Sequence, residues 1–367
     1  MPGWSFACGL CERPHEAGTA DYCLSCGAPV LGHHQATGPV HSGPGRGIWR
    51  YVEELPIAAE AEWLSLGESM TPAVPAPTLA AAVGVRAVWL KLDHLMTTGS
   101  FKDRLAAAGM AAALERSAPA VVCASSGNAA ASVAAYAARA GIPAVIVVPE
   151  KTPAGKLAAA TAYGAIPLAV PGDYSNSFAL ARELCRRYGL INLATTYINP
   201  IAVAALRSVA FDLDAQIGPD IDWVHVPTGS GPLVHGVAVG SRRLGRTPRL
   251  VAAQPEGCAP IASAFTRGAD TVRPWPEVMT SVSGIDDPLR GYAYDGTITL
   301  REIYRSEGRA VAVADTAIRA AQADLAAQGI FVEPAAAASV AAMTELARRG
   351  EYRPDDVVVC LLTGHGL

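Results

Sequence analysis

Short, continuous apolar runs alternate with longer alanine-rich segments along most of this chain. Apolar runs without polar alternation are typical of parallel strands in a sheet that helices cover on both faces. The runs lie at residues 88–92, 120–125, 143–148, 166–170, 222–227, 249–254 and 356–362. The alanine-rich segments have the composition of helices and lie at 103–115, from 128 onward, and at 153–163, 176–188, 315–327 and 334–349. The pattern predicts a doubly wound α/β fold.

The composition narrows the classes of function. With 367 residues, 51% hydrophobic residues and 17% charged residues, the chain can bury a large core and form two or three domains of roughly 100 to 200 residues. The net charge of −4 and the pI of about 6.1 argue against nucleic acid or an anionic membrane as a partner. A small neutral or anionic metabolite fits better.

Targeting and membrane signals are not visible in the sequence. The first thirty residues contain Glu12, Glu16 and Asp21 and no long apolar run, which disfavours a secretory signal. Later apolar stretches are interrupted by charge before the ~18 residues that a membrane span requires. We therefore expect a cytoplasmic protein with no membrane partner.

Residues 1–45 predict a separate N-terminal module followed by a linker, GPVHSGPGRG. Two Cys-x2-Cys pairs are typical of a tetrahedral structural zinc site of the ribbon type. The eleven residues between the pairs are fewer than in the commonest ribbons, so His15 as a ligand and a metal-free module remain alternatives. Disulfides are disfavoured because nothing marks the chain as exported. The expected zinc ligands are Cys8, Cys11, Cys23 and Cys26, whereas the scattered Cys123, Cys185, Cys258 and Cys360 are expected to be buried apolar residues.

Lys102 lies in the segment TTGSFKDR at residues 97–104, after an apolar run and at the start of a helical segment. A lysine at the start of a helix is ordinarily a solvated surface residue. A small-residue turn at a strand-to-helix junction, however, is a frequent setting for a functional side chain. Lys102 is therefore the first candidate for a catalytic residue.

The segment GSFKDR resembles the cofactor-lysine motif of threonine synthases, which are fold-type II (tryptophan synthase beta-like) pyridoxal-phosphate enzymes. Further family-like blocks follow in the expected order over residues 45–367. Lys91 lies eleven residues before Lys102, as a substrate-binding lysine does in such enzymes. The blocks are GESMTP at 67–72, SSGNAAASVAAYAARAG at 125–141, GIFVEPAAAAS at 329–339 and TGHGL at 363–367.

The resemblance implies two doubly wound parallel-sheet domains besides the zinc-ribbon-like module. Residues 46–100 plus 208–367 would form a large cofactor-binding domain, and residues 101–207 a small domain. Lys102 would carry pyridoxal 5'-phosphate as a Schiff base, with Phe101 beside it. A homodimer is also implied.

Other cofactor contacts follow from the same resemblance. Asn128 would bond the phenolic oxygen of the cofactor, although a helix N-cap is its ordinary alternative role. Thr363 would face the pyridine nitrogen with a hydroxyl, which favours elimination and replacement over transamination. A loop between an apolar run and a helix would hold the phosphate through backbone N–H groups, although Pro232 within it has none. The loop residues are Gly229, Ser230, Gly231 and Leu233.

The resemblance implies the substrate contacts less closely than the cofactor contacts. Ser125 and Ser126 are candidates for the substrate carboxylate. Candidates for a substrate phosphate are Lys91, Thr98, Ser126 and Arg207. The family's asparagine-proline before TGSFKDR is replaced by Met96-Thr97, the glycine after it is Leu105, and residues 199–208 lack acidic and lysine positions of the family pattern.

These features predict a lyase with a small amino-acid substrate. The first hypothesis is threonine synthesis, in which O-phosphohomoserine loses its γ-phosphate and water adds at Cβ through Lys102 and the cofactor. The second is β-replacement or β-elimination on O-phosphoserine, serine, threonine or an unusual amino acid, as in cysteate synthase or dehydratase relatives. A third, non-catalytic cofactor binding, is disfavoured by the intact GSFKDR.

Overall fold

The computed structural model describes residues 3–16, 21–36, 38–68, 70–172, 174–193 and 196–367. The chain forms two compact units, which are described separately below. Unit 1 comprises residues 1–69 and 96–206, and unit 2 comprises residues 70–95 and 207–367. Each unit contains a parallel sheet flanked by helices, as the alternation of apolar and alanine-rich segments predicts.

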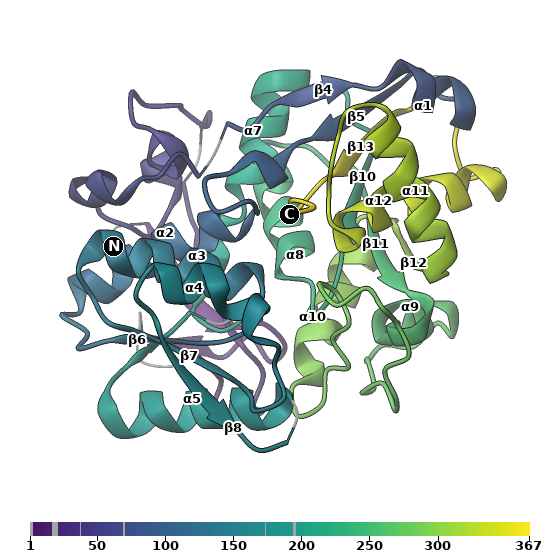
Figure 1. Ribbon diagram of the computed structural model, residues 1–367. Helices are drawn as coiled ribbons and strands as arrows, with labels where there is room; N and C mark the ends of the chain where they lie inside the picture. Colours follow the sequence, from purple (N-terminus) through teal and green to yellow (C-terminus); the bar gives the residue numbers. More distant parts are fainter. Residues whose placement is uncertain (1–2, 17–20, 37, 69, 173, 194–195) are drawn as a thin grey trace. The chain divides into compact units, whose positions relative to one another are not determined.

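Unit 1 is built on a four-stranded parallel sheet in the order β8-β7-β6-β9. Helices α2, α3 and α4 lie on one side of it and α5 on the other (Figure 1). The strands are β6 (Val121–Ala124), β7 (Ala144–Pro149), β8 (Ile166–Val170) and β9 (Ile191–Asn192). The helices are α2 (Lys102–Glu115), α3 (Asn128–Ala140), α4 (Ala158–Ala162), α5 (Tyr174–Tyr188) and α6 (Pro200–Ala205).

Two details of unit 1 differ from the sequence pattern. The segment 153–163 is a 3-10 turn, Ala154–Leu157, followed by the short α4, not one helix. The apolar run 166–170 forms the edge strand β8, where Ile166 is 56% exposed and Leu168 is 37% exposed. An apolar run alone does not distinguish an edge strand from a central one, because hydrogen-bonded neighbours decide that position.

The N-terminal part of the chain forms a three-stranded antiparallel sheet, β2-β1-β3, made of β1 (Trp4–Cys8), β2 (Pro14–His15) and β3 (Val30–His34). Cys8 ends β1, and the other three N-terminal cysteines lie outside the strands. This sheet is part of unit 1, because Phe6 and Val30 share a buried apolar cluster with Ala112 of α2 and Ile201 of α6. The predicted domain boundaries differ from the observed units in this part of the chain. Residues 46–69 also join unit 1 and not the predicted large domain, since their apolar side chains, such as Ile48 and Leu64, share a core with α2 and α3.

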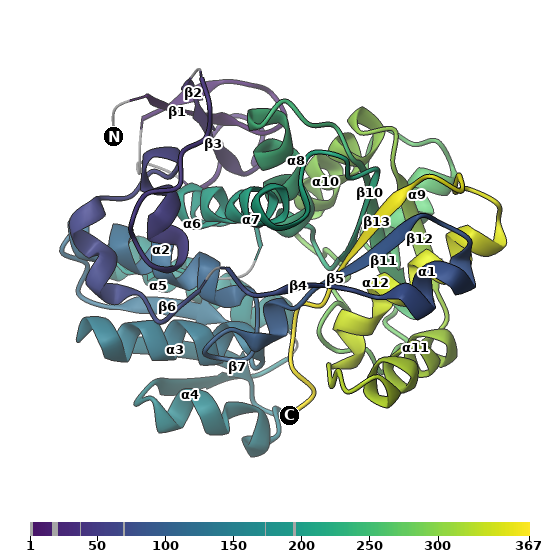
Figure 2. The same ribbon diagram turned by 90° about the horizontal axis from the view of Figure 1, so that it is seen from above.

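Unit 2 contains a six-stranded sheet in the order β12-β11-β10-β13-β5-β4, parallel except for the β4–β5 pair. Helices α11 and α12 lie on one side of this sheet and α8 and α10 on the other (Figure 2). The strands are β4 (Ala73–Pro75), β5 (Ala87–Lys91), β10 (Trp223–Pro227), β11 (Arg249–Pro255), β12 (Arg309–Val313) and β13 (Val357–Leu361). The helices are α1 (Pro77–Val83), α7 (Ser208–Ile217), α8 (Pro232–Arg243), α9 (Pro260–Thr266), α10 (Ala293–Arg305), α11 (Asp315–Ala327) and α12 (Pro334–Arg348).

Alanine explains how tightly α12 packs on the unit 2 sheet. Ala336, Ala337 and Ala338 have no exposed surface, and they belong to one core with Val358 and Cys360 of β13. Alanine fills this narrow space without losing side-chain rotamer freedom. In the described residues, no helix combines the length and apolar character needed to cross a bilayer.

Candidate active site

Lys102 is the first residue of α2 and follows a turn that contains Gly99 at φ +81°. Asp103 closes this turn, because its carboxylate accepts a hydrogen bond from the Thr98 backbone N–H at 2.9 Å and another from the Thr98 hydroxyl. The Lys102 Nζ lies 4.3 Å from the centroid of the Phe101 ring, within the range of a cation–π contact. The turn therefore fixes the start of the lysine side chain and places an aromatic ring beside it.

Asp103 is fully buried and connects the lysine turn to α3. The Ser132 hydroxyl of α3 donates to its Oδ1 at 2.6 Å. Burial raises the pKa of Asp103, although the hydrogen bonds from Ser132 and Thr98 oppose the shift, and the nearby Glu68 carboxyl also raises it. Asp103 has no role predicted from the sequence, although its place directly after Lys102 was a signal.

The loop Ser125–Gly127 follows the carboxyl end of β6 and leads into α3, whose first residue is Asn128. The Ser125 hydroxyl accepts a hydrogen bond from Gly127 N–H at 3.3 Å. Gly127 holds the N-cap position, so Asn128 does not have the capping role that was its ordinary alternative.

Lys102 lies close enough to β6 for its positive charge to influence the Cys123 thiol. Burial raises the pKa of the Cys123 thiol to about 12, and the positive charge of Lys102 opposes this shift. Cys123 is two residues before Ser125. Within unit 1, the structure therefore brings Lys102 and Phe101 near the loop that carries Ser125, Ser126 and Asn128.

The chain contains four lysines, which makes their environments easy to compare. Lys151 and Lys156 are exposed in the segment after β7. Lys91 is fully buried at the end of β5 and forms an ion pair. Lys102 alone among the four is half-buried at the carboxyl-end side of a parallel sheet, the edge at which ligands bind in open α/β folds.

Unit 2 contains a second group of predicted residues, in the loop from Thr228 to Gly231 between β10 and α8. The carbonyl of Gly229 accepts from Gln254 Nε2 at 3.2 Å, and the carbonyl of Ser230 accepts from Thr299 Oγ1 at 2.7 Å. In a trans peptide the N–H points opposite to the preceding carbonyl. These two bonds therefore turn the N–H groups of Ser230 and Gly231 away from Gln254 and Thr299.

The donor set of this loop fits a phosphate. Within the described part of the chain, the N–H groups of Gly229, Ser230 and Leu233 donate to no acceptor, although Ser230 and Leu233 are buried. Buried backbone donors are rarely left unsatisfied, and N–H groups at a helix start favour an anion. Gly231 has φ +101°, and a Cβ there would lie 2.2 Å from Thr299 Oγ1, so only glycine suits this position.

Sequence reasoning did not find the two side chains that hold this loop. Thr299 lies on α10, far along the chain, and no local pattern connects it with Ser230. Gln254 gave a signal, because it is a polar residue at the end of the apolar run 249–254. It is fully buried, and its Oε1 accepts from the N–H groups of Ile261 and Ala262 at 2.9 and 3.0 Å.

Thr363 follows β13 and is buried. Because β13 pairs in parallel with β10, Thr363 leaves the sheet at the same edge as the loop after β10. The TGHGL segment is fixed to the chain before α12 by a bridge between Val332 and His365 and by a hydrogen bond from Glu333 N–H to Gly364 O at 3.0 Å. The structure thus brings Thr363 and the glycine loop to one edge of the unit 2 sheet.

Lys91 and Arg207, the two cations predicted for a substrate phosphate, are both buried in unit 2. The Lys91 Nζ lies 3.6 Å from Asp212 Oδ2 and donates to the Thr71 carbonyl. Arg207 precedes the first residue of α7. A contact between either cation and a substrate stays a prediction.

The four N-terminal cysteines converge, with all four Sγ atoms within 4.8 Å of one another. Cys8 and Cys26 are 3.4 Å apart at sulfur, and Cys11 and Cys23 are 3.7 Å apart. Four sulfurs about 2.3 Å from one zinc ion would be separated by roughly 3.8 Å. In addition, the N–H groups of Leu10 and Cys11 point at Cys8 Sγ. The donors and their spacing fit a tetrahedral zinc ion.

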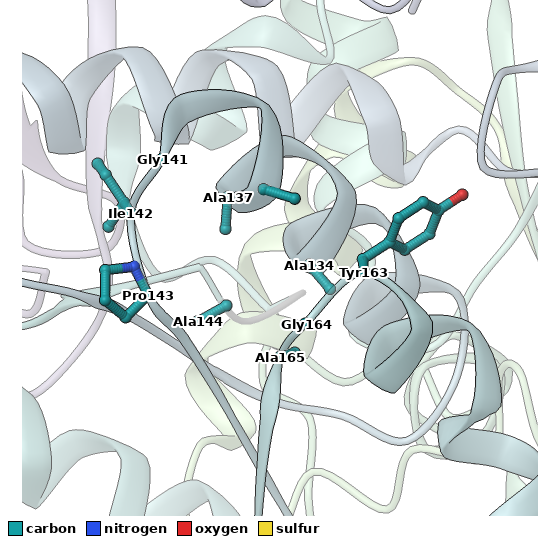
Figure 3. Close-up of a pocket in the computed structure, with 10 residues that line it drawn as sticks. Ala134, Ala137, Gly141, Ile142, Pro143, Ala144, Tyr163, Gly164 and Ala165 are labelled. Atoms are coloured by element: carbon teal, nitrogen blue, oxygen red, sulfur yellow. The ribbon is translucent and has the colours of Figure 1, made fainter.

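A cavity of about 250 Å³ in unit 1 lies away from all of these residues (Figure 3). It is lined by the C-terminal part of α3, the start of β7 and the chain after α4, including Ala137, Ile142 and Tyr163. This is the amino-end side of the parallel sheet, whereas Ser125 and Asn128 lie at the carboxyl end. None of the predicted site residues lines this cavity.

Comparison with known proteins identifies the family. The family model described as "Pyridoxal-phosphate dependent enzyme" matches residues 64–364. The chain belongs to this family. It is 35% identical to the threonine synthase of Methanocaldococcus jannaschii over 88% of this chain and 80% of that protein. It is 36% identical to the threonine synthase of Methanosarcina acetivorans over 87% and 79% of the two chains.

Solved structures agree at the level of the fold. Maize serine racemase is similar with a TM-score of 0.72 and 25% identity, covering 82% of this chain and 89% of that one. The T.th. threonine deaminase has a TM-score of 0.70 and 27% identity, covering 82% and 93%. The predicted α/β fold of type II, the pyridoxal-phosphate cofactor and the threonine synthase-like, lyase character are thereby confirmed.

Proposed function

We propose that this enzyme converts O-phosphohomoserine into threonine, by loss of the γ-phosphate and addition of water at Cβ. The observation that carries the proposal is the turn at Thr98–Asp103, which presents Lys102 beside Phe101 in a chain that is 35% identical to a threonine synthase over most of its length. Pyridoxal phosphate, when bound, supplies an electron sink for charge that develops at the substrate's Cα.

Each unit contains residues that we propose as cofactor contacts. Lys102 provides the amine for covalent attachment, Phe101 packs beside it, and Asn128 donates to the phenolic oxygen. Thr363 offers a hydroxyl to the pyridine nitrogen, and a hydroxyl does not hold that nitrogen protonated as an aspartate would. The backbone N–H groups of the loop after β10 bind the phosphate, through Gly229, Ser230, Gly231 and Leu233.

Lys102 also moves the proton. Its Nζ accepts the proton from the substrate's Cα and can return it during the steps that follow. Ser125 and Ser126 would bind the substrate carboxylate with hydroxyl and N–H groups at the start of α3. Thr98, Ser126, Lys91 and Arg207 are the proposed contacts of the γ-phosphate.

Three further properties belong to this proposal. A zinc ion held by the four N-terminal cysteines would stabilise the small antiparallel sheet of unit 1. We also propose a homodimer, which analytical ultracentrifugation would test, and a cytoplasmic location, which cell fractionation would test.

A second reaction is favoured by one observation. The Lys91 ammonium is engaged by Asp212 and the Thr71 carbonyl inside unit 2, which leaves fewer cations for a γ-phosphate. β-Elimination or β-replacement on O-phosphoserine, serine, threonine or an unusual amino acid would need no cation opposite Cγ. Both reactions use the same Lys102 chemistry.

A substrate panel separates the two reactions. The purified holoenzyme is incubated with O-phosphohomoserine, O-phosphoserine, serine and threonine, and released phosphate, threonine and 2-oxo acids are measured. Threonine and phosphate formed in equal amounts from O-phosphohomoserine are the expected result. Lys102→Ala should abolish turnover, and the exposed Lys151→Ala is the matched control that should not. Turnover of O-phosphoserine alone would overturn threonine synthesis in favour of the second reaction.

A further inference from the structure

Helix α3 of unit 1 is hydrogen-bonded to two carboxylates that have no exposed surface. Its Ser132 hydroxyl donates to Asp103 Oδ1 at 2.6 Å, and its Tyr136 hydroxyl donates to Glu68 Oε2 at 2.9 Å. Ser132 and Tyr136 are four residues apart in the sequence, so they lie on the same face of the helix, one turn from each other. One face of α3 is therefore bound to acidic side chains from two different segments of the chain.

Glu68 organises the segment that precedes it. Its Oε2 also accepts from the Leu66 N–H at 2.9 Å and from the Ser65 hydroxyl at 3.1 Å. A carboxylate without access to water is stable only when hydrogen bonds satisfy it, and these donors provide them. The Leu66 carbonyl in turn accepts from the hydroxyl of Thr97, which lies in the segment before Lys102. Glu68 thus joins α3 to the chain that leads into the Lys102 turn.

Helix α3 is connected to the Lys102 turn by two separate links. The direct link consists of Ser132, Asp103 and Thr98. The indirect link consists of Tyr136, Glu68, Leu66 and Thr97. The direct link reaches the turn immediately after Lys102, and the indirect link reaches the chain before it. The position of the lysine relative to α3 is therefore held from both directions along the chain.

The Tyr136 hydroxyl keeps its proton and can act as the donor of the indirect link. It has no exposed surface. Burial raises the pKa of Tyr136, and the nearby carboxyls of Glu68 and Asp103 raise it further. Only an acceptor suits the position opposite this hydroxyl, and Glu68 provides one.

The contact between α2 and α3 needs such links, because small side chains form much of it. Ala107 and Ala130 are buried in the core that the two helices share. Alanine side chains are too short to interlock deeply across a helix pair, so they do not fix how far one helix slides along the other. The start of α2 carries Lys102, and the loop Ser125–Gly127 leads into Asn128 at the start of α3. Hydrogen bonds at both links supply the register between these two starts.

We propose that Glu68 and Tyr136 are positioning residues, which act through the indirect link to hold Lys102 in place relative to the start of α3. Their loss lowers the rate at which Lys102 attaches pyridoxal phosphate and transfers a proton, and it leaves the proposed carboxylate contacts on α3 unchanged. The kinetic part of this inference rests on the proposed function, whereas the attachment part rests only on Lys102 as the attachment residue.

The test uses substitutions that remove one hydrogen bond and nearly preserve shape. Tyr136→Phe breaks the indirect link at α3, Thr97→Val breaks it at its other end, and Ser132→Ala breaks the direct link. Tyr136→Phe is also combined with each of the other two. Tyr304→Phe is the matched control, because the Tyr304 hydroxyl donates to the Ala269 carbonyl at 3.1 Å in unit 2.

Three quantities are measured for each variant. The holoenzyme gives kcat and KM for O-phosphohomoserine. The apoprotein gives the rate constant for attachment of pyridoxal phosphate to Lys102, followed by absorbance. Denaturant unfolding gives the free energy of unfolding and shows that each variant is folded under the assay conditions.

Each single variant should lower kcat and the attachment rate roughly two- to fivefold, because the other link still holds the turn. KM should stay within about twofold of the parent, since the substrate contacts on α3 are intact. Tyr136→Phe/Ser132→Ala breaks both links, so it should lose more than the product of the single effects, by roughly tenfold. Tyr136→Phe/Thr97→Val breaks one link twice, so it should match the slower single variant within about twofold. Tyr304→Phe should match the parent.

Glu68→Leu breaks the indirect link at its centre and should lower kcat and the attachment rate as Tyr136→Phe does. It also leaves the Ser65 hydroxyl and the Leu66 N–H without their acceptor, which lowers stability. If Glu68→Leu does not fold, the substitutions at the two ends of the link, at Tyr136 and Thr97, decide the inference by themselves.

Three results would overturn the inference. The first is that the effects of Tyr136→Phe and Ser132→Ala simply multiply in the double variant. The second is a rise in KM at the parent's kcat in Tyr136→Phe, which would place Tyr136 at the substrate. The third is a lower free energy of unfolding with the parent's kcat and attachment rate, which would limit both links to stabilising the fold. If the parent does not turn over O-phosphohomoserine, the proposed function fails, but the attachment rates still decide the role of the links.

Discussion

Replacing Gly231 by alanine should disturb the loop between β10 and α8, which we assign to the cofactor's phosphate, more than adding a methyl group at any other position of that loop. Gly231 has φ +101°, and a Cβ there would lie 2.2 Å from Thr299 Oγ1, 2.4 Å from Thr299 Cγ2 and 2.8 Å from Thr299 Cβ. Thr299 does not move away freely, because its hydroxyl donates to the Ser230 carbonyl and is 3.2 Å from the Asp295 carbonyl. The methyl group must therefore displace the loop itself.

The magnitude follows from these contacts. A left-handed alanine costs about 1–2 kcal/mol, and overpacking of a buried site costs about 1–3 kcal/mol. We expect the free energy of unfolding of Gly231→Ala to fall by about 2–5 kcal/mol. A displaced loop also loses at least one hydrogen bond to a charged phosphate, about 1.5–3 kcal/mol, so the dissociation constant of pyridoxal phosphate should rise roughly ten- to hundredfold.

The assay is an equilibrium titration of the apoprotein with pyridoxal phosphate, followed by absorbance, together with denaturant unfolding. Gly218→Ala is the matched control, because Gly218 has φ +100° in the same unit but no atom within 4 Å of its added Cβ. It should lose stability without losing cofactor affinity. The double variant Gly231→Ala/Thr299→Ala removes the two closest contacts, so the added methyl should cost less in that background. Parent-like cofactor affinity in Gly231→Ala would refute the assignment of this loop to the phosphate.

Other substitutions test the remaining parts of the account. Burial raises the pKa of Glu302, but hydrogen bonds from His235 and Arg242 outweigh it and hold the pKa well below its usual range. Glu302→Gln should therefore lower the free energy of unfolding by about 3 kcal/mol near pH 7. Protonation of Glu302 removes the same ion-pair contribution from the parent. The difference in unfolding free energy between parent and variant should therefore shrink as the pH falls below about 4.3. An unchanged difference at pH 3 would argue against the pair. Asp103→Asn should slow turnover by loosening the turn at Thr98, and Ser132→Ala should slow it less. Equal rates in the parent and both variants would contradict the role of Asp103 in holding this turn. Metal analysis should find one zinc per chain and none in Cys8→Ser, and a metal-free parent of equal stability would remove zinc from the account.

The strands were predictable because their apolar runs must be buried, and every central strand of both parallel sheets coincides with such a run. The position of Lys102 was predictable for a similar reason, since a small-residue turn between a strand and a helix is visible in the sequence. Asn128 was open to a capping role until the structure placed Gly127 at that position. The local sequence pattern was therefore sufficient to predict features that depend on burial or on the direction of the chain.

Contacts between distant segments were not predictable. Lys91 was assigned to substrate by its spacing from Lys102, but nothing in that spacing reveals that Asp212 lies beside its ammonium. The grouping of residues 46–69 with unit 1 likewise depends on which helices their apolar side chains meet. Pairing of this kind is decided by tertiary packing, which a single sequence does not encode in any local pattern.

The central claim is that Lys102 is the side chain to which pyridoxal phosphate attaches. Borohydride reduction of the holoprotein followed by peptide mass spectrometry tests it directly, because the chain has four lysines. The account predicts the label on the peptide that carries Lys102, and on none that carries Lys91, Lys151 or Lys156. A label on another lysine, or full turnover by Lys102→Ala, would contradict it.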